Sequence, residues 1–120
     1  MTAKKTTPAK LAQYKAEYDQ LKEQFLQLGY ILQGSVTERY MECGKPSCSC
    51  RDDPARRHGP YYQWSRKIRA KTESTYLSAE QARICSEWIQ NHRQMEELMR
   101  RMQKISRRVA ALLKIIGKPG

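Results

Sequence analysis

The chain lacks any long apolar run. Hydrophobic types make up 39% of its 120 residues, and the mean hydropathy is −0.84. No stretch approaches the roughly 20 consecutive apolar residues of a membrane-spanning helix, which excludes an integral helical membrane protein. The opening MTAKKTTPAK leads into a polar helical pattern without the apolar core of a signal peptide, so we expect a cytoplasmic protein.

Acidic residues are also scarce, with 12 Asp and Glu against 23 Lys and Arg, and the formal charge is +11. Nucleic acid is the usual partner of such a chain, because Lys and Arg neutralise phosphates and release counterions. A solvated basic surface kept for solubility is the alternative. The charge is concentrated in two stretches: residues 35–71 hold nine basic and four acidic residues, and residues 98–120 hold seven basic and no acidic ones.

The four cysteines do not form an obvious disulfide framework, because Cys85 lies in a helical pattern far from the other three. Cys43, Cys48, Cys50 and His58 supply three thiolates and an imidazole, the ligand set of a closed structural zinc site. Ordinary reduced cysteines in a loop are the alternative, but the segment has little apolar surface to bury them. Four protein ligands leave no position for water, so the pattern predicts a zinc staple rather than a catalytic metal.

Two segments carry apolar residues at alternating steps of three and four. The first predicts a helix from Pro8 to Leu28, and the second predicts a long helix over residues 79–116. Because the helices flank the cysteine-rich region, we expect them to pair as an antiparallel coiled coil. The expected organisation is a basic tail (1–7), a coiled-coil helix (8–29), a β module (34–78), the long helix (79–116) and a short tail (117–120).

The unequal helix lengths predict self-association. At 1.5 Å per residue the first helix spans about 30 Å and the second about 57 Å, so roughly the last 15 to 17 residues of the second are expected to lack an intramolecular partner. Asn91, the polar residue of the second pattern, is expected to fix register. We therefore expect a homodimer or higher oligomer, held by Leu98, Met102, Ile105, Val109, Leu112 and Ile116.

Between the helices, alternation predicts strands over residues 35–42, 60–68 and 72–77, joined as a meander. In the second strand, Tyr61, Gln63, Ser65 and Lys67 fall on one face and Tyr62, Trp64, Arg66 and Ile68 on the other. So polar a sheet needs the metal at one end and a helix on one face, which Ala82, Cys85 and Ile89 are placed to provide. The predicted fold is α+β, a small three-stranded antiparallel zinc-stapled sheet between two long helices.

A sheet rich in Arg, Lys, Thr and aromatic residues suits nucleic-acid recognition. Strands enter the major groove, where Arg and Gln read bases and Lys and Thr hold phosphates. Tyr61, Tyr62 and Trp64 suggest the alternative of stacking on unpaired bases of single-stranded DNA or RNA, although at least half of the sheet's aromatic residues are needed for its small core. The candidate nucleic-acid-binding residues are Arg39, Arg56, Arg57, Gln63, Arg66, Lys67, Arg69 and Lys71.

The blocks GSVTERYMECGKPSCSC, HGPYYQWSRKIRAKT and LSAEQARICSEWI resemble a family of small bacterial proteins of unknown function with a CGKxxCxC and HGPYY motif, over about residues 34–93. The resemblance implies a bacterial or phage source, often near mobile elements, and brings no activity with it. More loosely, the order of strands and helix is similar to that of the amino-terminal DNA-binding modules of some tyrosine recombinases.

Nothing in the sequence assembles into a catalytic site. Of the two histidines, His58 is assigned to zinc and His92 to the long helix, and no general base accompanies a tyrosine nucleophile beside Arg57. We expect a non-enzymatic, dimeric, zinc-stapled protein that binds nucleic acid, with duplex DNA favoured, as an accessory or regulatory factor of a mobile element beside a recombinase or transposase. The alternatives are a coiled-coil adaptor for a partner protein and a single-strand or RNA-binding subunit of a ribonucleoprotein.

Overall fold

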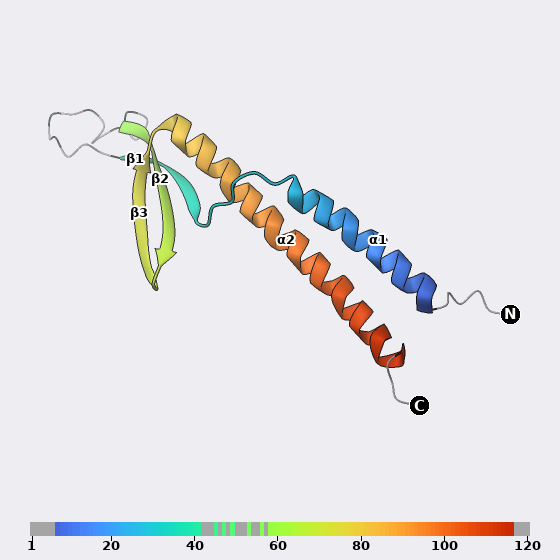
Figure 1. The fold of residues 1–120 in the computed structure, drawn as a ribbon. Coiled ribbons are helices and arrows are strands. Elements are labelled where there is room, and N and C mark those ends of the chain that lie inside the picture. Colours follow the sequence, from blue (N-terminus) through green and yellow to red (C-terminus); the bar gives the residue numbers. More distant parts are fainter. Residues whose placement is uncertain are drawn as a thin grey trace. The chain divides into compact units, whose positions relative to one another are not determined.

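The protein has an α+β fold of two helices and one three-stranded antiparallel sheet, seen in a computed structural model (Figure 1). The structure describes residues 7–41, 45, 47, 49, 53, 56 and 58–116. The chain divides into two compact units, residues 1–29 with 93–120 and residues 30–92, and the long second helix contributes to both. The elements are α1 (Thr7–Leu26), β1 (Ser35–Met41), β2 (His58–Ile68), β3 (Lys71–Leu77) and α2 (Ala79–Ile116).

The bounds of the elements follow from local sequence signals. Ser78 and Gln81 form a capping box at the start of α2: the Gln81 backbone N–H donates to Ser78 Oγ at 3.1 Å, and the Ser78 N–H donates to Gln81 Oε1 at 2.9 Å. At the end of α1, the Leu28 N–H donates to the Phe25 carbonyl at 3.2 Å, a tightened last turn. The predicted helices and strands are therefore confirmed, with ends that differ by one or two residues.

In the first unit, α1 packs against the second half of α2. Leu21, Leu98 and Ile105 are buried and form its core, and six partly buried side chains pack against them: Tyr14, Tyr18, Phe25, Leu28, Met102 and Val109. The pairing is antiparallel, because early residues of α1 such as Leu11 line a groove with Leu113, whereas Gln24 lines a groove with Arg101. That the pair supercoils as a coiled coil stays a prediction.

The expectation that the end of α2 lacks an intramolecular partner is wrong, because α1 lies there. The reason is the connection that follows α1, which runs along α2 before it enters β1. The Leu32 N–H donates to the Trp88 carbonyl at 3.1 Å, and the Tyr30 and Trp88 rings lie 5.0 Å apart. Asn91 donates to the Tyr30 carbonyl at 2.8 Å, so it anchors this connection within the chain.

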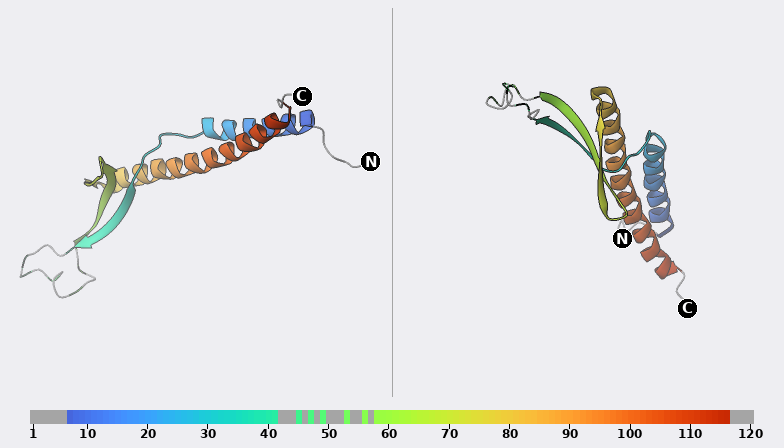
Figure 2. Two further views of the ribbon diagram at one scale, coloured as in Figure 1. Left: turned by 90° about the horizontal axis from the view of Figure 1, so that it is seen from below. Right: turned by 90° about the vertical axis from the view of Figure 1, so that its left-hand side faces the viewer.

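The sheet is a meander with β2 in the centre, and all its pairs are antiparallel. Thr37 lies opposite Gln63 and Gln63 opposite Tyr76, whereas Val36 lies opposite Trp64 and Trp64 opposite Thr75. Because directly opposed residues share a face, this register confirms the two predicted faces of β2 and extends them across all three strands. Figure 2 shows the strands and their twist from two further directions.

One side of the sheet faces the start of α2, and we call it the helix side. Val36, Glu38 and Tyr62 line a cavity there, together with α2 residues such as Ala82. Ala82 is 4% exposed and Ile89 is 6% exposed, while Cys85 is half-buried, which confirms the predicted cover of the sheet by the start of α2. Burial of one face is what allows so small a sheet to persist.

Trp64 fixes the entry of the chain into β1. Its Nε1–H donates to the Gln33 carbonyl at 2.9 Å. Gly34 has φ +116, and a Cβ there would lie 2.6 Å from Trp64 Nε1 and would also clash with the Ser65 carbonyl oxygen. Only glycine fits this position without strain.

Strands β2 and β3 are joined by Arg69 and Ala70, with φ +50 and +66. Two consecutive positive φ values in a two-residue connection are typical of a type I′ turn, which matches the twist of the strands. Neither residue of this turn is a glycine, so the backbone of both is left-handed, a conformation that costs roughly 1–2 kcal/mol per residue.

Neither described helix combines the length and hydropathy needed to cross a membrane.

Candidate nucleic-acid interface

The side of the sheet opposite the helix side carries a row of polar and aromatic side chains, and we call it the open face. No helix of the described chain lies on it (Figures 1 and 2). Alternation and register assign ten side chains of the three strands to this face: Ser35, Thr37, Arg39, Tyr61, Gln63, Ser65, Lys67, Thr72, Ser74 and Tyr76.

The open face has cations and hydrogen-bonding groups but no carboxylate among its residues. Arg39 Nη1 donates to Gln63 Oε1 at 3.3 Å, which aligns a guanidinium and an amide on neighbouring strands. Lys67 is exposed further along β2. Arg and Gln side chains are those that pair with base edges, and Lys holds phosphates as a point charge. Three of the predicted nucleic-acid-binding residues thus share one face.

Hydroxyl and aromatic groups fill the rest of the open face. The Ser65 and Ser74 hydroxyls are hydrogen bonded at 2.9 Å across β2 and β3. Tyr61 is 40% exposed and Tyr76 is 61% exposed, so each presents part of its ring to solvent. Exposed rings beside hydroxyls and cations are suited to contact sugars, phosphates or unstacked bases.

The acidic groups of the described strands, Glu38 and Glu73, lie on the helix side. The Tyr40 hydroxyl donates a hydrogen bond to Glu38 Oε1 at 2.9 Å. This hydrogen bond, with the negative charge of Glu38, raises the pKa of Tyr40 above its ordinary value. Glu73 lies 3.8 Å from Arg66. Because the acidic residues lie on the helix side, no carboxylate of the described strands balances the positive charges of Arg39 and Lys67 on the open face.

Arg66, predicted to contact nucleic acid, has a structural role on the helix side. Its guanidinium carbon lies 3.9 Å from the centre of the Trp64 ring, and its Nη1 donates to Thr75 Oγ1 at 2.6 Å. Only 19% of its side chain is exposed. Arg66 and Lys67 are neighbours in one strand, so they cannot point to the same face.

The other predicted nucleic-acid-binding residues lie off the open face. Lys71 is opposite Ile68 at the turn end of the helix side, and Arg69 is in the turn itself. Arg56 is exposed and lies 3.5 Å from Asp53. Arg57 lies outside the described residues. The basic set therefore divides between an open face, a turn and the connection from β1 to β2.

Of the predicted zinc ligands, only His58 lies in the described part of the chain; Cys43, Cys48 and Cys50 lie outside it. His58 is exposed, begins β2 and lies opposite Met41. That pair closes the two ends of the cysteine-rich connection. The described residues contain no group of three or more potential metal ligands, so the zinc staple stays a prediction.

Four of the six residues predicted to drive oligomerisation pack within the chain. Leu98 and Ile105 are buried in the core of the first unit, Met102 and Val109 pack against that core, and Leu112 is half-buried. The side chain of Ile116 lies outside the described part. The apolar strip of α2, from which self-association was predicted, therefore packs on α1. The oligomeric state itself stays a prediction.

The chain belongs to a family described as a domain of unknown function, DUF6788, whose model matches residues 11–89. The match covers more than half of the 120 residues and includes most of α1, the sheet and the start of α2. Membership in an uncharacterised family, expected from the sequence blocks, is thereby confirmed. No curated protein and no solved structure matches the chain.

The sequence analysis identified Arg39 of β1 but missed the other open-face residues of β1 and all those of β3. Thr37, Thr72, Ser74 and Tyr76 were not among the predicted site residues, although alternation within each strand carries the necessary signal. The missing information was the register, because only the pairing of Gln63 with Thr37 and Tyr76 shows which alternate set of each strand shares its face.

A substitution of Arg66 tests its structural role. We expect Arg66→Ala to lower the free energy of unfolding by about 1–2 kcal/mol, because it removes a cation–π contact and a charged hydrogen bond at a mostly buried site. Lys67→Ala is the control, being an exposed cation on the same strand, and should change stability by less than about 0.5 kcal/mol. Chemical denaturation of both variants measures the difference; equal stabilities would contradict the assignment.

Proposed function

We propose that this protein is a non-enzymatic nucleic-acid-binding protein that contacts duplex DNA with the open face of its sheet. The single observation that carries the proposal is the alignment of Arg39, Gln63 and Lys67 on one uncovered face without a carboxylate. Three-stranded and two-stranded β surfaces are known to present Arg and Gln to the major groove. The net charge of +11 supports a polyanionic partner.

Ion pairing distinguishes Arg39 of the open face from two arginines elsewhere in the second unit. Arg66 and Arg83, which lie outside the open face, are already paired with carboxylates within the chain, at 3.8 Å from Glu73 and 2.7 Å from Glu80. Arg39 instead donates to a neutral amide. Its charge therefore remains available to a phosphate or to the acceptor atoms of guanine.

Binding to single strands is a second candidate, favoured by the exposure of Tyr61 and Tyr76. Stacking of a base on an exposed ring contributes roughly 1–3 kcal/mol per base. Trp64 does not contribute to this reading, because its indole lies beneath Arg66 and donates to the Gln33 carbonyl. Duplex DNA remains our first choice, since the rest of the open face consists of hydrogen-bonding side chains.

Zinc is the cofactor we propose, held by Cys43, Cys48, Cys50 and His58. The pairing of Met41 with His58 supports the proposal, because it brings the two ends of the connection together where β1 ends and β2 begins. Three thiolates and an imidazole match the preferred ligands of a structural Zn²⁺. A metal that closes this connection would stabilise the strand pair β1 and β2.

A role beside a recombinase or transposase of a mobile element, in a bacterial cytoplasm, rests on the sequence resemblance. The adaptor alternative would use the helix pair to bind a partner protein. The two readings differ in which substitutions abolish function: those on the open face for a nucleic-acid-binding protein, and those on the helix pair for an adaptor.

Removing the two cations of the open face should weaken DNA binding. We expect Arg39→Gln with Lys67→Gln to make the slope of log K against log salt concentration shallower by about 1.8 for a random duplex, because each lost phosphate contact changes it by about 0.9. Fluorescence anisotropy at several salt concentrations measures this slope. Circular dichroism and thermal unfolding establish that the variant is folded.

Lys10→Gln with Arg93→Gln is the matched control, since it removes one lysine and one arginine that are exposed on the helices. It should bind nearly as wild type. An equal loss of DNA affinity in both double variants would show that binding depends only on the overall charge and would contradict the proposal. Unchanged binding by the open-face variant would also overturn it. Tyr61→Ala then separates the two nucleic-acid readings, because it should weaken single-strand binding more than duplex binding.

Metal content tests the zinc proposal directly. We expect the purified chain to hold one Zn²⁺, and Cys48→Ser to lose it, because a site with two thiolates and one imidazole binds zinc far less tightly. Cys85→Ser is the control, as Cys85 is half-buried in α2. Elemental analysis of the three proteins gives the answer; absence of zinc in wild type, or its loss in Cys85→Ser, would contradict the assignment.

We propose that a second copy of the chain covers the apolar groove of the helix pair, which is lined by Tyr14, Tyr18, Val109 and Leu113 among others. Leu113 is 54% exposed, and α1 contributes a single buried side chain, Leu21, to the core. Two such pairs joined by a twofold axis would bury both grooves as a four-helix bundle.

Leu113→Asp is therefore expected to convert a dimer to a monomer in light scattering. It is a better probe than Leu98→Asp, because Leu98 is 2% exposed and a charge there would unfold the helix pair. Met99→Asp is the control variant, because Met99 is 48% exposed and does not line the apolar groove. It should affect association less than Leu113→Asp. A monomeric wild type would refute the dimer.

A further inference from the structure

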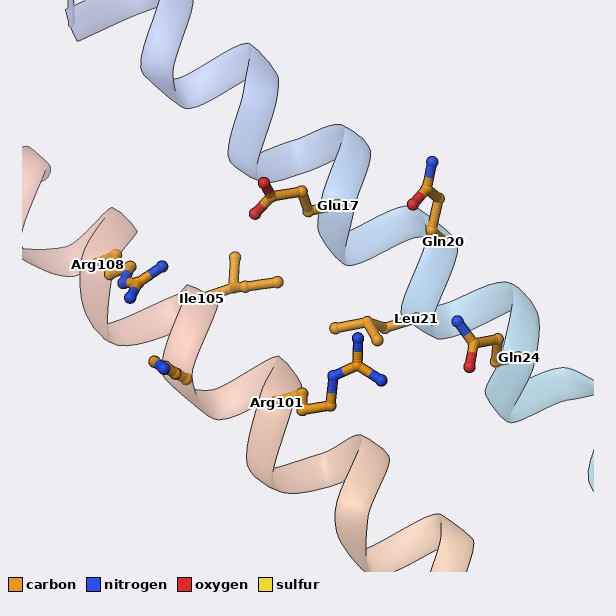
Figure 3. A pocket seen from close by; sticks show the side chains of 8 residues that line it. Glu17, Gln20, Leu21, Gln24, Arg101, Ile105 and Arg108 are labelled. Atoms are coloured by element: carbon orange, nitrogen blue, oxygen red, sulfur yellow. The ribbon is translucent and has the colours of Figure 1, made fainter.

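A second basic feature lies on the first unit. It is a groove between α1 and α2, seen in Figure 3. Leu21 and Ile105 form its floor, and both are buried, at 4% and 8% exposure. Six polar side chains line it: Glu17, Gln20 and Gln24 from α1, and Arg101, Lys104 and Arg108 from α2. We call it the basic groove.

The cations of the basic groove follow from the helical period. Arg101, Lys104 and Arg108 are separated by three and four residues, so they lie along one strip of α2. From Arg101 to Arg108 this strip extends about 10.5 Å along the helix. No acidic residue follows Glu97 in the sequence, so the strip has no carboxylate neighbour further along its own helix.

The cations of the basic groove form no ion pair within the described part of the chain. Arg100, one residue before Arg101, is hydrogen bonded to Glu97. This hydrogen bond, together with the charges of Arg100 and Arg101, lowers the pKa of that carboxyl. Among the described residues, Glu17 is the one acid that lines the groove. In Figure 3, Arg101 extends from α2 toward Leu21 and Gln24, which leaves its guanidinium at the groove surface.

We propose that the basic groove binds the phosphate backbone of a nucleic acid, as a sequence-independent contact separate from the open face. The strip of about 10.5 Å corresponds to about three base-pair steps of DNA, at an axial rise of about 3.4 Å per step. Gln20 and Gln24 add amide donors on the opposite wall. Phosphate contacts of this kind carry affinity and orientation without reading bases.

An acidic protein segment is the competing ligand, and the lining of the groove disfavours it. A peptide that docks between helices is held by apolar anchors in pockets, with charges at the rim. Here the apolar floor is already buried under the side chains that line the groove, and the walls are polar. A flexible phosphate backbone needs no such pocket, because charge neutralisation supplies most of its affinity.

The test uses the full-length chain and anisotropy of a labelled random duplex over a range of salt concentrations. Arg101→Gln with Arg108→Gln should make the slope of log K against log salt concentration shallower by about 1.8. Arg93→Gln with Arg107→Gln is the matched control, because it removes two exposed arginines of the same helix that do not line the groove. Equal effects of the two double variants would overturn the assignment.

A change of opposite sign gives an independent test that loss of folding cannot imitate. Glu17→Gln removes the one carboxylate of the groove and should strengthen duplex binding about two- to fivefold, as expected for one exposed charge interaction. Glu23→Gln removes a carboxylate from the same helix but outside the groove lining, and should have a smaller effect. Unchanged or weaker binding by Glu17→Gln would refute the groove.

The same measurements separate the groove from the open face. If the groove variants respond as expected while Arg39→Gln with Lys67→Gln binds as wild type, the groove holds nucleic acid and the proposal for the sheet fails. The reverse pattern leaves the sheet as the binding surface and removes the groove. Competition by poly-L-glutamate at the charge concentration at which DNA competes would assign the groove to acidic protein and so overturn the nucleic-acid proposal.

Discussion

Burial against α2 is the constraint on which the described structure depends. Among the described residues, five apolar side chains are buried: Ala82, Ile89, Leu98 and Ile105 belong to α2, and the fifth, Leu21, packs against the last two. The sheet and α1 each have only one face to bury, and neither has enough apolar surface to form a core alone. One helix of 38 residues serves both units, which explains why its apolar pattern continues for so long.

This use of α2 also decides which surfaces remain for binding. Because the helix side of the sheet holds the aromatic and ion-pairing groups, including Trp64 and Arg66, the opposite face is left with Arg39, Gln63 and Lys67. In the first unit, the apolar strip of α2 packs on α1, and the cations on one flank of that strip line the basic groove. The open face is therefore the side of the sheet opposite its buried side, and the basic groove lies beside the buried apolar strip of α2.

The fold was largely predictable because its signals are local. The spacing of Leu21 with its neighbours, the Ser78 capping box and the alternation through Tyr61 and Tyr62 each predict an element from a few adjacent residues. The site was only partly predictable. From the sequence, Arg66 and Lys67 were equal candidates for binding nucleic acid. The pleat of the strand turns their side chains to opposite faces. Arg66 is held on the helix side by contacts with the Trp64 ring, Thr75 and Glu73.

The sequence by itself determined the number, type and order of the elements, the strong positive charge and the membership of the chain in its family. These depend on composition and short-range periodicity. Only the tertiary structure decided where α1 lies along α2 and which alternate residues of β1 and β3 join Gln63. Both depend on contacts between distant residues, such as the Asn91 hydrogen bond to Tyr30 and the strand register, and no local pattern encodes them.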